Sequence, residues 1–303
     1  MLERISGSLL DPDALYASTI ELFHSPELRG LDLVMGFTGF ADAGHVVKQI
    51  NAELLDTLDT ETVAVFDADQ LIDYRSRRPH ISFVEDHLQD YQAPKLALYK
   101  LKDGLGSPFL LLAGFEPDLQ WERFARAVVG IVEKLDVNLV TWIHSIPMPV
   151  PHTRPVGVTG FASDESLIGH LGFLRSSYEG PTGVVGALHH ACQQHGLPSA
   201  SLWASVPHYV AAAPNPKAAL ALIRGFEGLV GLAVDAAPLE EAAAEYERQV
   251  NDAVASDPDV KAFVEQLEER MDDVQGERPD RLPSADSIAR DFQRYLKQRG
   301  PDS

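Results

Sequence analysis

The chain has 303 residues, of which 45% are hydrophobic and 23% are charged, and its formal net charge at pH 7 is −20. This length and composition are typical of a globular protein that is either one large domain or one domain with an appendage. The negative charge excludes a general nucleic-acid binder and a protein that binds anionic membranes through its charge, because phosphate groups would be repelled.

The N-terminal segment contains acidic residues and lacks the long apolar stretch of a signal peptide. No run of apolar residues approaches the roughly 20 that a membrane-spanning helix requires. Cys192 is the only cysteine, so the chain cannot form an intrachain disulfide, which fits a reducing compartment. We therefore expect a soluble cytoplasmic protein.

The sequence pattern of residues 31–58 predicts the central unit of the fold, after a first strand at 19–23. An apolar run at 31–35 leads through three glycines into apolar residues at helical spacing, which predicts a strand, a glycine-rich turn and a helix. Asp42 lies where the N-cap of that helix belongs. With Gly39 it could bind an anion, or the turn could simply be a tight, capped connection. The glycine spacing matches neither common phosphate-binding motif, so both interpretations stay open.

A second strand is predicted at residues 61–66, and the order strand, helix, strand predicts a parallel crossover. Residues 67–80 then break the pattern and contain many charges, among them Asp69 and Arg75. Carboxylates and arginines at this density suit either the orientation of a substrate or an internal network of ion pairs.

Further strands are predicted at residues 81–84, 96–101, 109–113 and 138–143. Glu116 follows the third of these, and Pro117 suits the first turn of a helix that continues past Trp121. The fourth is followed by a proline-rich segment, residues 144–160, which predicts a long loop containing His152 and Arg154.

A glycine-rich sequence at residues 180–186 predicts the start of a helix near Thr182, which should end near Gly196. A last core strand is predicted at residues 200–206, and Asn215 with Pro216 predicts the start of another helix. Alternating strands and helices of these lengths indicate an α/β fold, with a layered, mostly parallel or mixed sheet flanked by helices. We place this core domain at residues 1–235.

From residue 236 onwards, the sequence predicts helices and no strands. These last 68 residues contain 17 acidic and 9 basic residues, a net charge of −8. Apolar stripes recur at helical spacing, and Ser284 is a candidate cap for a final helix. Residues 236–303 are therefore predicted to form an acidic, helical C-terminal extension that packs on the core or on another subunit.

The chemical motifs are weak. His189 and His190 are adjacent and diverge on a helix, and there is no HExxH motif or cysteine pair, so no metal site and no cofactor are predicted. No G-x-S-x-G motif is present, and Cys192 lies in an apparent amphipathic helix, where a buried and inert thiol is expected. A histidine–carboxylate pair could form between distant residues such as His144, His152, Glu116 and Glu179.

Six segments between Gly36 and Leu220 resemble the proteasome assembly chaperone two family, in its actinobacterial branch. They are GFTGFADAG, FDADQLIDYRSRRP, GFEPDLQW, SIPMPVPHTRP, YEGPTGVVGALHHACQQHGLPSASLWASVPHYV and NPKAAL. The resemblance implies a phosphorylase/hydrolase-like α/β fold in a homo-oligomer, for which a trimer is one candidate. It also implies a non-catalytic assembly chaperone, with proteasome subunits as candidate partners. The docking tail of the eukaryotic relatives, a hydrophobic residue, tyrosine and any residue at the C-terminus, has no match here, because Tyr295 is eight residues from the end.

The alternative is a small-molecule-binding protein or an enzyme, either hydrolase/phosphorylase-like or an ATP-dependent ligase, with a cleft at the strand ends. In that case Glu116 or His152 would perform acid–base chemistry. The ligand-binding candidates would be Gly39, Asp42, Asp69, Arg75, Arg154 and Thr182. This alternative requires these residues to line one pocket.

Overall fold

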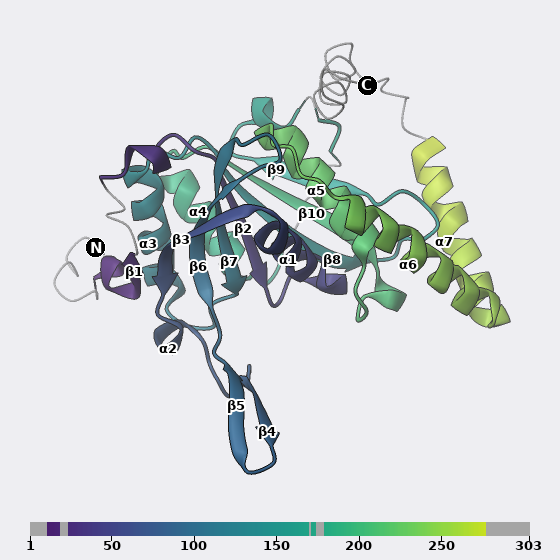
Figure 1. The fold of residues 1–303 in the computed structure, drawn as a ribbon. Coiled ribbons are helices and arrows are strands. Elements are labelled where there is room, and N and C mark those ends of the chain that lie inside the picture. The colour runs from purple at the N-terminus through teal and green to yellow at the C-terminus, as the bar shows by residue number, and fades with distance from the viewer. Residues whose placement is uncertain (1–10, 19–23, 170, 174–178, 277–303) are drawn as a thin grey trace, which may run out of the picture.

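An eight-stranded mixed sheet forms the centre of the fold in the computed structural model, which describes residues 11–18, 24–169, 171–173 and 179–276 (Figure 1). The order of its strands is β1 (Tyr16–Ser18), β3 (Asp59–Phe66), β6 (Leu96–Lys102), β7 (Pro108–Phe115), β2 (Leu33–Thr38), β8 (Val140–Met148), β10 (Ser199–Pro207) and β9 (Val158–Ala162). The neighbours β7, β2, β8 and β10 are parallel, whereas the outer pairs are antiparallel. The predicted α/β class is confirmed.

The predicted crossover from β2 to β3 spans two other strands. β3 runs in the same direction as β2, since it is antiparallel to β6, which is antiparallel to β7. However, β6 and β7 lie between β3 and β2, so the two strands joined by the first helix are not neighbours. Strand order therefore depends on later segments of the chain.

Helices cover both faces of this sheet. α3 (Trp121–Lys134) and α4 (Val184–Gln194) pack on one face, and α1 (Val46–Thr57) and α5 (Pro216–Val230) pack on the other. In β2, Leu33, Met35 and Phe37 point into the first core and Val34 into the second, which is the alternation of a strand buried on both sides.

The C-terminal helices extend the second of these layers. α6 (Ala237–Ala255) packs against α5, and α7 (Pro258–Gly276) packs against α6. Leu239 of α6 belongs to the same buried cluster as α1 and α5. Among the described residues, no helix is long and apolar enough to cross a membrane.

A two-stranded hairpin, β4 (His80–Val84) and β5 (His87–Gln92), projects away from the sheet (Figure 1). Glu85 and Asp86 form its turn, and Glu85 has a φ of 55°, as expected in a two-residue hairpin turn. The strand predicted at residues 81–84 is thus part of this hairpin and not of the core, and β5 was not predicted. The short helix α2 (Ala68–Leu71) precedes it.

The described chain also contains short 3-10 helices. They are η1 (Pro12–Leu15), η2 (Pro26–Leu28), η3 (Ala43–His45), η4 (Glu165–Leu167) and η5 (His208–Val210). The strand predicted at residues 19–23 and the helix predicted after Ser284 lie outside the described residues.

Two predictions about proline were wrong. Residues 144–160 are not a continuous loop, because β8 extends to Met148 and β9 begins at Val158. Proline has no backbone N–H to donate to a neighbouring strand. β8 pairs with β2 only as far as Ile143, so at Pro147 no N–H donor is needed on the side of the strand that faces β2. Pro117 does not begin α3, because the N–H groups of the next two residues bond to Leu71 and the helix begins at Trp121.

Candidate functional site

The carboxyl ends of the parallel strands lie along one edge of the sheet. β2, β7, β8 and β10 end at this edge. The candidate acid–base and ligand-binding residues follow the ends of these strands or of β3, except Thr182, which lies just before α4. Ligands of open α/β sheets bind at such an edge. The structure therefore brings the candidates to a common edge, but their contacts divide them into three groups.

Glu116 connects the two glycine-rich turns and forms the first group. Its side chain is buried, and its Oε2 accepts the backbone N–H of Phe40 at 2.9 Å while its Oε1 accepts that of Val184 at 2.9 Å. A Cβ at Gly39 would lie 2.8 Å from Oε2, and one at Gly183 would lie 2.5 Å from Oε1. A side chain at either glycine would collide with the carboxylate, so both turns need glycine for the carboxylate to reach the two N–H groups.

These contacts are those of a helix cap. Val184 is the first residue of α4, where unpaired N–H groups and the helix dipole favour a carboxylate. Among the described residues, no histidine or hydroxyl group bonds to the Glu116 carboxylate, so the contacts do not support the acid–base role considered from the sequence. Thr182 is exposed beside the same helix, and its hydroxyl donates to the carbonyl of Gly183 at 3.3 Å.

Asp42 caps α1 from the neighbouring turn. Its Oδ1 accepts the backbone N–H of Val47 at 2.7 Å, although η3 separates Asp42 from the first residue of the helix. Burial raises the pKa of Asp42 to about 6, and the hydrogen bond from Val47 opposes part of this rise. The N–H that an external anion would use is therefore occupied by the carboxylate of the protein itself.

Replacing Asp42 by asparagine should stabilise the protein at neutral pH. Because the pKa in the folded protein is above the ordinary value of 3.8 for an aspartate, the carboxyl group contributes most to stability below about pH 4, and this contribution is lost as the pH rises through about 6. Asparagine keeps the acceptor without the charge. We expect D42N to raise the free energy of unfolding by on the order of 2 kcal/mol at pH 7.5.

Urea unfolding between pH 4 and pH 8 would test this expectation, and a difference between D42N and wild type that does not change with pH would contradict it. Asp164 is a matched control at an exposed turn. Hydrogen bonds from Ser166 lower the pKa of its carboxyl group, so D164N should lose a small amount of stability above about pH 4 instead of gaining it.

Asp69 and Arg75 form the second group, in the charged segment 67–80. Arg75 pairs with Asp73, with 3.1 Å between Nε and Oδ1, and its side chain is 88% exposed. Asp69 accepts a hydrogen bond from the Tyr74 hydroxyl at 2.7 Å. Each candidate therefore binds a near neighbour in the sequence, which is the arrangement of an internal polar network rather than of a substrate site.

Arg154 and His152 form the third group, against the C-terminal helices. The Arg154 guanidinium lies 2.6 Å from Asp272 and 3.5 Å from Glu268, both on α7. Thr153 also donates a hydrogen bond to Glu268. This proline-rich segment is thus bound to α7, and the charge of Arg154 is paired within the chain.

His152 is 3% exposed, and both of its ring nitrogens are hydrogen-bonded. Nδ1 lies 2.7 Å from the Tyr209 hydroxyl, and Nε2 lies 3.0 Å from Oδ1 of Asn251. Because the amide oxygen of Asn251 can only accept, Nε2 carries the ring proton, and Nδ1 accepts the proton of the Tyr209 hydroxyl. Burial lowers the pKa of His152, which keeps the ring neutral. No ring nitrogen is left for a substrate.

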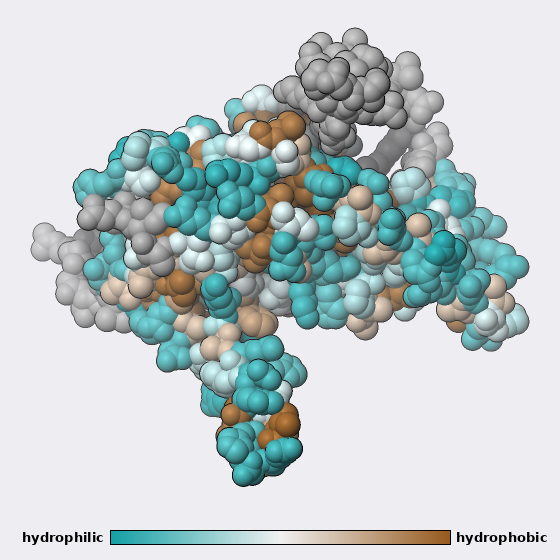
Figure 2. All heavy atoms as spheres, in the orientation of Figure 1, coloured by the Kyte–Doolittle hydropathy of each residue, from teal (hydrophilic) through white to brown (hydrophobic). Residues whose placement is uncertain are grey.

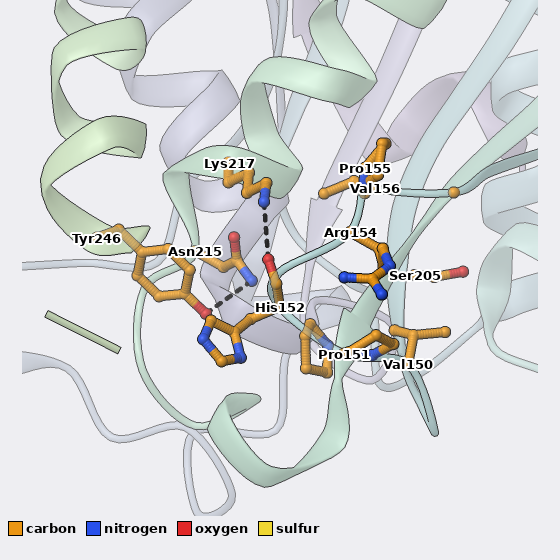
Figure 3. A pocket seen from close by; sticks show the side chains of 12 residues that line it. Val150, Pro151, His152, Arg154, Pro155, Val156, Ser205, Asn215, Lys217 and Tyr246 are labelled. Carbon is orange, nitrogen blue, oxygen red and sulfur yellow. Dashed lines mark hydrogen bonds between the residues drawn. The ribbon is translucent and has the colours of Figure 1, made fainter. Parts of the chain in front are cut away.

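A narrow pocket opens beside His152 (Figure 3). Lys217 points to its rim, where its Nζ donates to the carbonyl of His152 at 2.7 Å and to Glu247 at 2.9 Å. Asn215 donates to the Tyr246 hydroxyl at 3.1 Å. The pocket has room for about one water molecule, whereas sites for small organic ligands hold roughly 300 Å³ or more. It is therefore too small for a substrate.

The other reactive residues are buried. His144 Nε2 lies 2.9 Å from the hydroxyl of Ser201, which is fully buried, and burial lowers the pKa of His144 to about 4. Burial also raises the pKa of the Cys192 thiol to about 12, as expected for an inert thiol. No group of three or more histidine, cysteine, aspartate or glutamate residues in the described ranges could hold a metal ion.

The model of the PAC2 family matches residues 36–254, which is more than half of the chain. The chain belongs to the PAC2 family. The assignment agrees with the resemblance seen in the sequence, because PAC2 is the proteasome assembly chaperone two family. No protein of curated function matches the chain.

Solved structures of this PAC2-family fold include bacterial and archaeal proteins. A Mycobacterium tuberculosis protein of unknown function is 38% identical with a TM-score of 0.81, covering 86% of this chain and 92% of its own. A proteasome-assembly chaperone homologue from M. tuberculosis is 32% identical with a TM-score of 0.70, covering 77% of this chain and 100% of its own. An archaeal proteasome activator from Pyrococcus furiosus is 16% identical with a TM-score of 0.59, covering 78% of this chain and 97% of its own. At this identity the similarity shows the fold alone.

Two features of this PAC2-family chain were missed in the sequence. One is the projecting hairpin, which could have been predicted from the two short segments on either side of Glu85 and Asp86. The other is Arg77, whose guanidinium donates to the carbonyl of Glu116 at 2.5 Å. No local pattern distinguishes Arg77 from Arg75 or Arg78, because its partners lie about 40 residues away in the sequence.

Proposed function

We propose that this PAC2-family protein is a non-catalytic, cytoplasmic protein that binds other proteins, acts as a homo-oligomer and resembles an assembly chaperone. A relative described as a proteasome-assembly chaperone homologue, 32% identical to this chain, supports the general role. The observation that carries the proposal is the β4–β5 hairpin. The enzyme alternative has little support, since the candidate residues divide into separate groups and the pocket beside His152 is too small.

The hairpin exposes large apolar side chains (Figure 2). Phe83 is 70% exposed, Leu88 is 67% exposed and Tyr91 is 60% exposed. An isolated two-stranded hairpin is at best marginally stable in water, and clustered exposed apolar side chains mark sites of protein–protein contact. The hairpin is therefore suited to be covered by another protein chain.

A second copy of the chain is the occupant that we propose for this hairpin. The edge of the sheet from which the hairpin projects exposes further large apolar side chains, with Phe40 76% exposed, Leu119 48% exposed and Phe115 39% exposed. A homo-oligomer would supply both apolar surfaces, one from each copy. A trimer would use the same pair of surfaces repeatedly around a ring.

Mutating the hairpin would test self-association. We expect the F83S/L88S variant to have a lower molar mass than wild type by light scattering, because two apolar contacts are lost from the interface. L105S is the matched control, since Leu105 is 53% exposed on the turn between β6 and β7 and should leave the mass unchanged. A monomeric wild-type protein, or an unchanged mass for F83S/L88S, would contradict the proposed homo-oligomer.

Proteasome subunits are the partners that we propose to test first. Purified α and β subunits of an actinobacterial proteasome would be mixed with and without the protein, and the appearance of assembled core would be followed on native gels. We expect the protein to bind the subunits and change the rate of assembly. If it neither binds them nor changes that rate, the link to the proteasome fails, whatever the oligomeric state.

A further inference from the structure

Arg77 connects the stem of the hairpin to the end of β7. It lies three residues before β4, and its Nη1 donates to the carbonyl of Glu116 at 2.5 Å. Its Nη2 lies 3.1 Å from Oδ1 of Asp118, and its guanidinium lies over the ring of Phe115 at 5.7 Å from the centroid. The side chains of Arg77 and Asp118 are only 23% and 22% exposed, so water screens this ion pair less than one on the open surface.

The carboxylate of Asp118 holds the loop before the hairpin at two points. While Oδ1 pairs with Arg77, Oδ2 accepts the backbone N–H of Asp73 at 2.9 Å. The backbone N–H of Arg77 in turn donates to the carbonyl of Asp73 at 3.1 Å. Residues 73–77 are thus a closed turn fixed to the connection between β7 and α3.

The returning strand of the hairpin passes the same place. A Cβ at Gly114 would lie 2.1 Å from the backbone oxygen of Lys95, which follows β5 in the chain. Gly114 has a φ of 148° and lies in β7, one residue before the ring that Arg77 covers. Both ends of the hairpin are therefore anchored at residues 114–118.

We propose that Arg77 is a positioning residue, which fixes the direction of the hairpin and thereby the geometry of the contact between copies. This inference rests on the proposed homo-oligomer. β4 and β5 pair only with each other among the described strands, so the direction of the hairpin depends on its stem. The planar guanidinium contacts a carbonyl, a carboxylate and an aromatic ring together, which a lysine ammonium cannot do in the same geometry.

Distances between two labels would measure the direction of the hairpin directly. Spin labels would be attached to cysteines that replace Asp86 at the hairpin turn and Asp56, which is exposed near the end of α1, in a chain carrying C192A. A large excess of unlabelled chain with the native hairpin would keep the measured distance within one copy. We expect a narrow distribution with Arg77 and a clearly broader one with R77A or R77K. An unchanged distribution would overturn the inference.

Arg75 provides the matched control in the same loop. Its side chain is 88% exposed and pairs only with the neighbouring Asp73 in the described contacts, so R75A should leave the distribution narrow. In the chain with an intact hairpin, R77A should raise the concentration at which half of the oligomer dissociates by roughly tenfold, with R75A unchanged. Tryptophan fluorescence, to which Trp121, the buried Trp142 and Trp203 all contribute, should report an unchanged body fold.

The outcomes separate the two proposals. If F83S/L88S does not dissociate the oligomer, the proposed homo-oligomer interface fails. In a second outcome, F83S/L88S dissociates the oligomer, but R77A and R77K change neither the dissociation of the oligomer nor the distances between the labels. The proposed interface would then be supported, and the proposed role of Arg77 would be wrong. R77K serves as the second variant if R77A lowers the yield of folded protein.

Discussion

Replacing Glu116 by alanine is expected to lower the free energy of unfolding by about 4 kcal/mol. The carboxylate accepts the backbone N–H groups of Phe40 and Val184, both at 2.9 Å. Leaving a buried N–H unpaired costs roughly 1–3 kcal/mol, and here the buried N–H of Val184 and the partly buried N–H of Phe40 both lose their acceptor. The variant also removes a negative charge from the start of α4, where the helix dipole stabilises such a charge. Urea unfolding at pH 7.5 would measure the loss.

Glutamine at position 116 is the conservative control. E116Q keeps the shape and one acceptor oxygen, but its amide nitrogen faces one of the two N–H groups, so we expect about half the loss of E116A. Hydrogen exchange at the amides of Phe40 and Val184 should become faster in both variants. A loss below about 1 kcal/mol in E116A would show that water replaces the carboxylate, and would contradict the capping role.

Replacing Glu227 by alanine is expected to cost about 3 kcal/mol. Its side chain is fully buried, Oε1 accepts the backbone N–H of Val234 at 2.7 Å, and Oε2 lies 2.8 Å from Arg224. Removing one partner of a buried ion pair costs about 3–5 kcal/mol, and the lower value applies because the Arg224 side chain is 37% exposed. Thermal and urea unfolding would both report this loss.

Glu240 provides the matched control for Glu227. It pairs with the same arginine at 2.8 Å, but its side chain is 56% exposed. Exposed ion pairs contribute roughly 0–1 kcal/mol, so E240A should cost much less than E227A. Equal effects of E227A and E240A would mean that the buried position of Glu227 contributes little, contrary to this prediction.

Glu227 also holds the connection between α5 and α6. Val234 lies in this connection, and on its other side Oδ2 of Asp103 accepts the backbone N–H of Ala233 at 2.9 Å. The two buried carboxylates thus bind the segment that joins the expected core to the expected C-terminal extension. The division at residues 235 and 236 itself stays a prediction.

Local sequence was sufficient for several elements of the fold. The apolar run of β2 alternates between the two cores as a strand must, and Asn215 caps α5 by accepting the N–H of Ala218 at 2.9 Å. These features depend on side chains within a few residues of one another. Pro117 and Pro147 were misread because their surroundings depend on distant segments, Leu71 in one case and the end of the β2 pairing in the other.

The candidate site shows the same limit more clearly. Polar residues after strands were predicted to meet at one edge, and the strand ends do lie there. However, the sequence could not show that the carboxylate of Glu116 would be taken by Phe40 and Val184, or that Arg154 would pair with Asp272. Such pairings join residues 68 to 118 positions apart.

The sequence by itself determined the α/β class, most of the strands and helices, and the membership suggested by its motifs. Those properties follow from the period of apolar residues, from glycine and proline, and from short caps, all of which act over a few residues. Only the tertiary structure decided the strand order, the projecting hairpin and the partners of each buried charge. Packing brings distant residues together, and burial then requires each charge or N–H group to find a partner there.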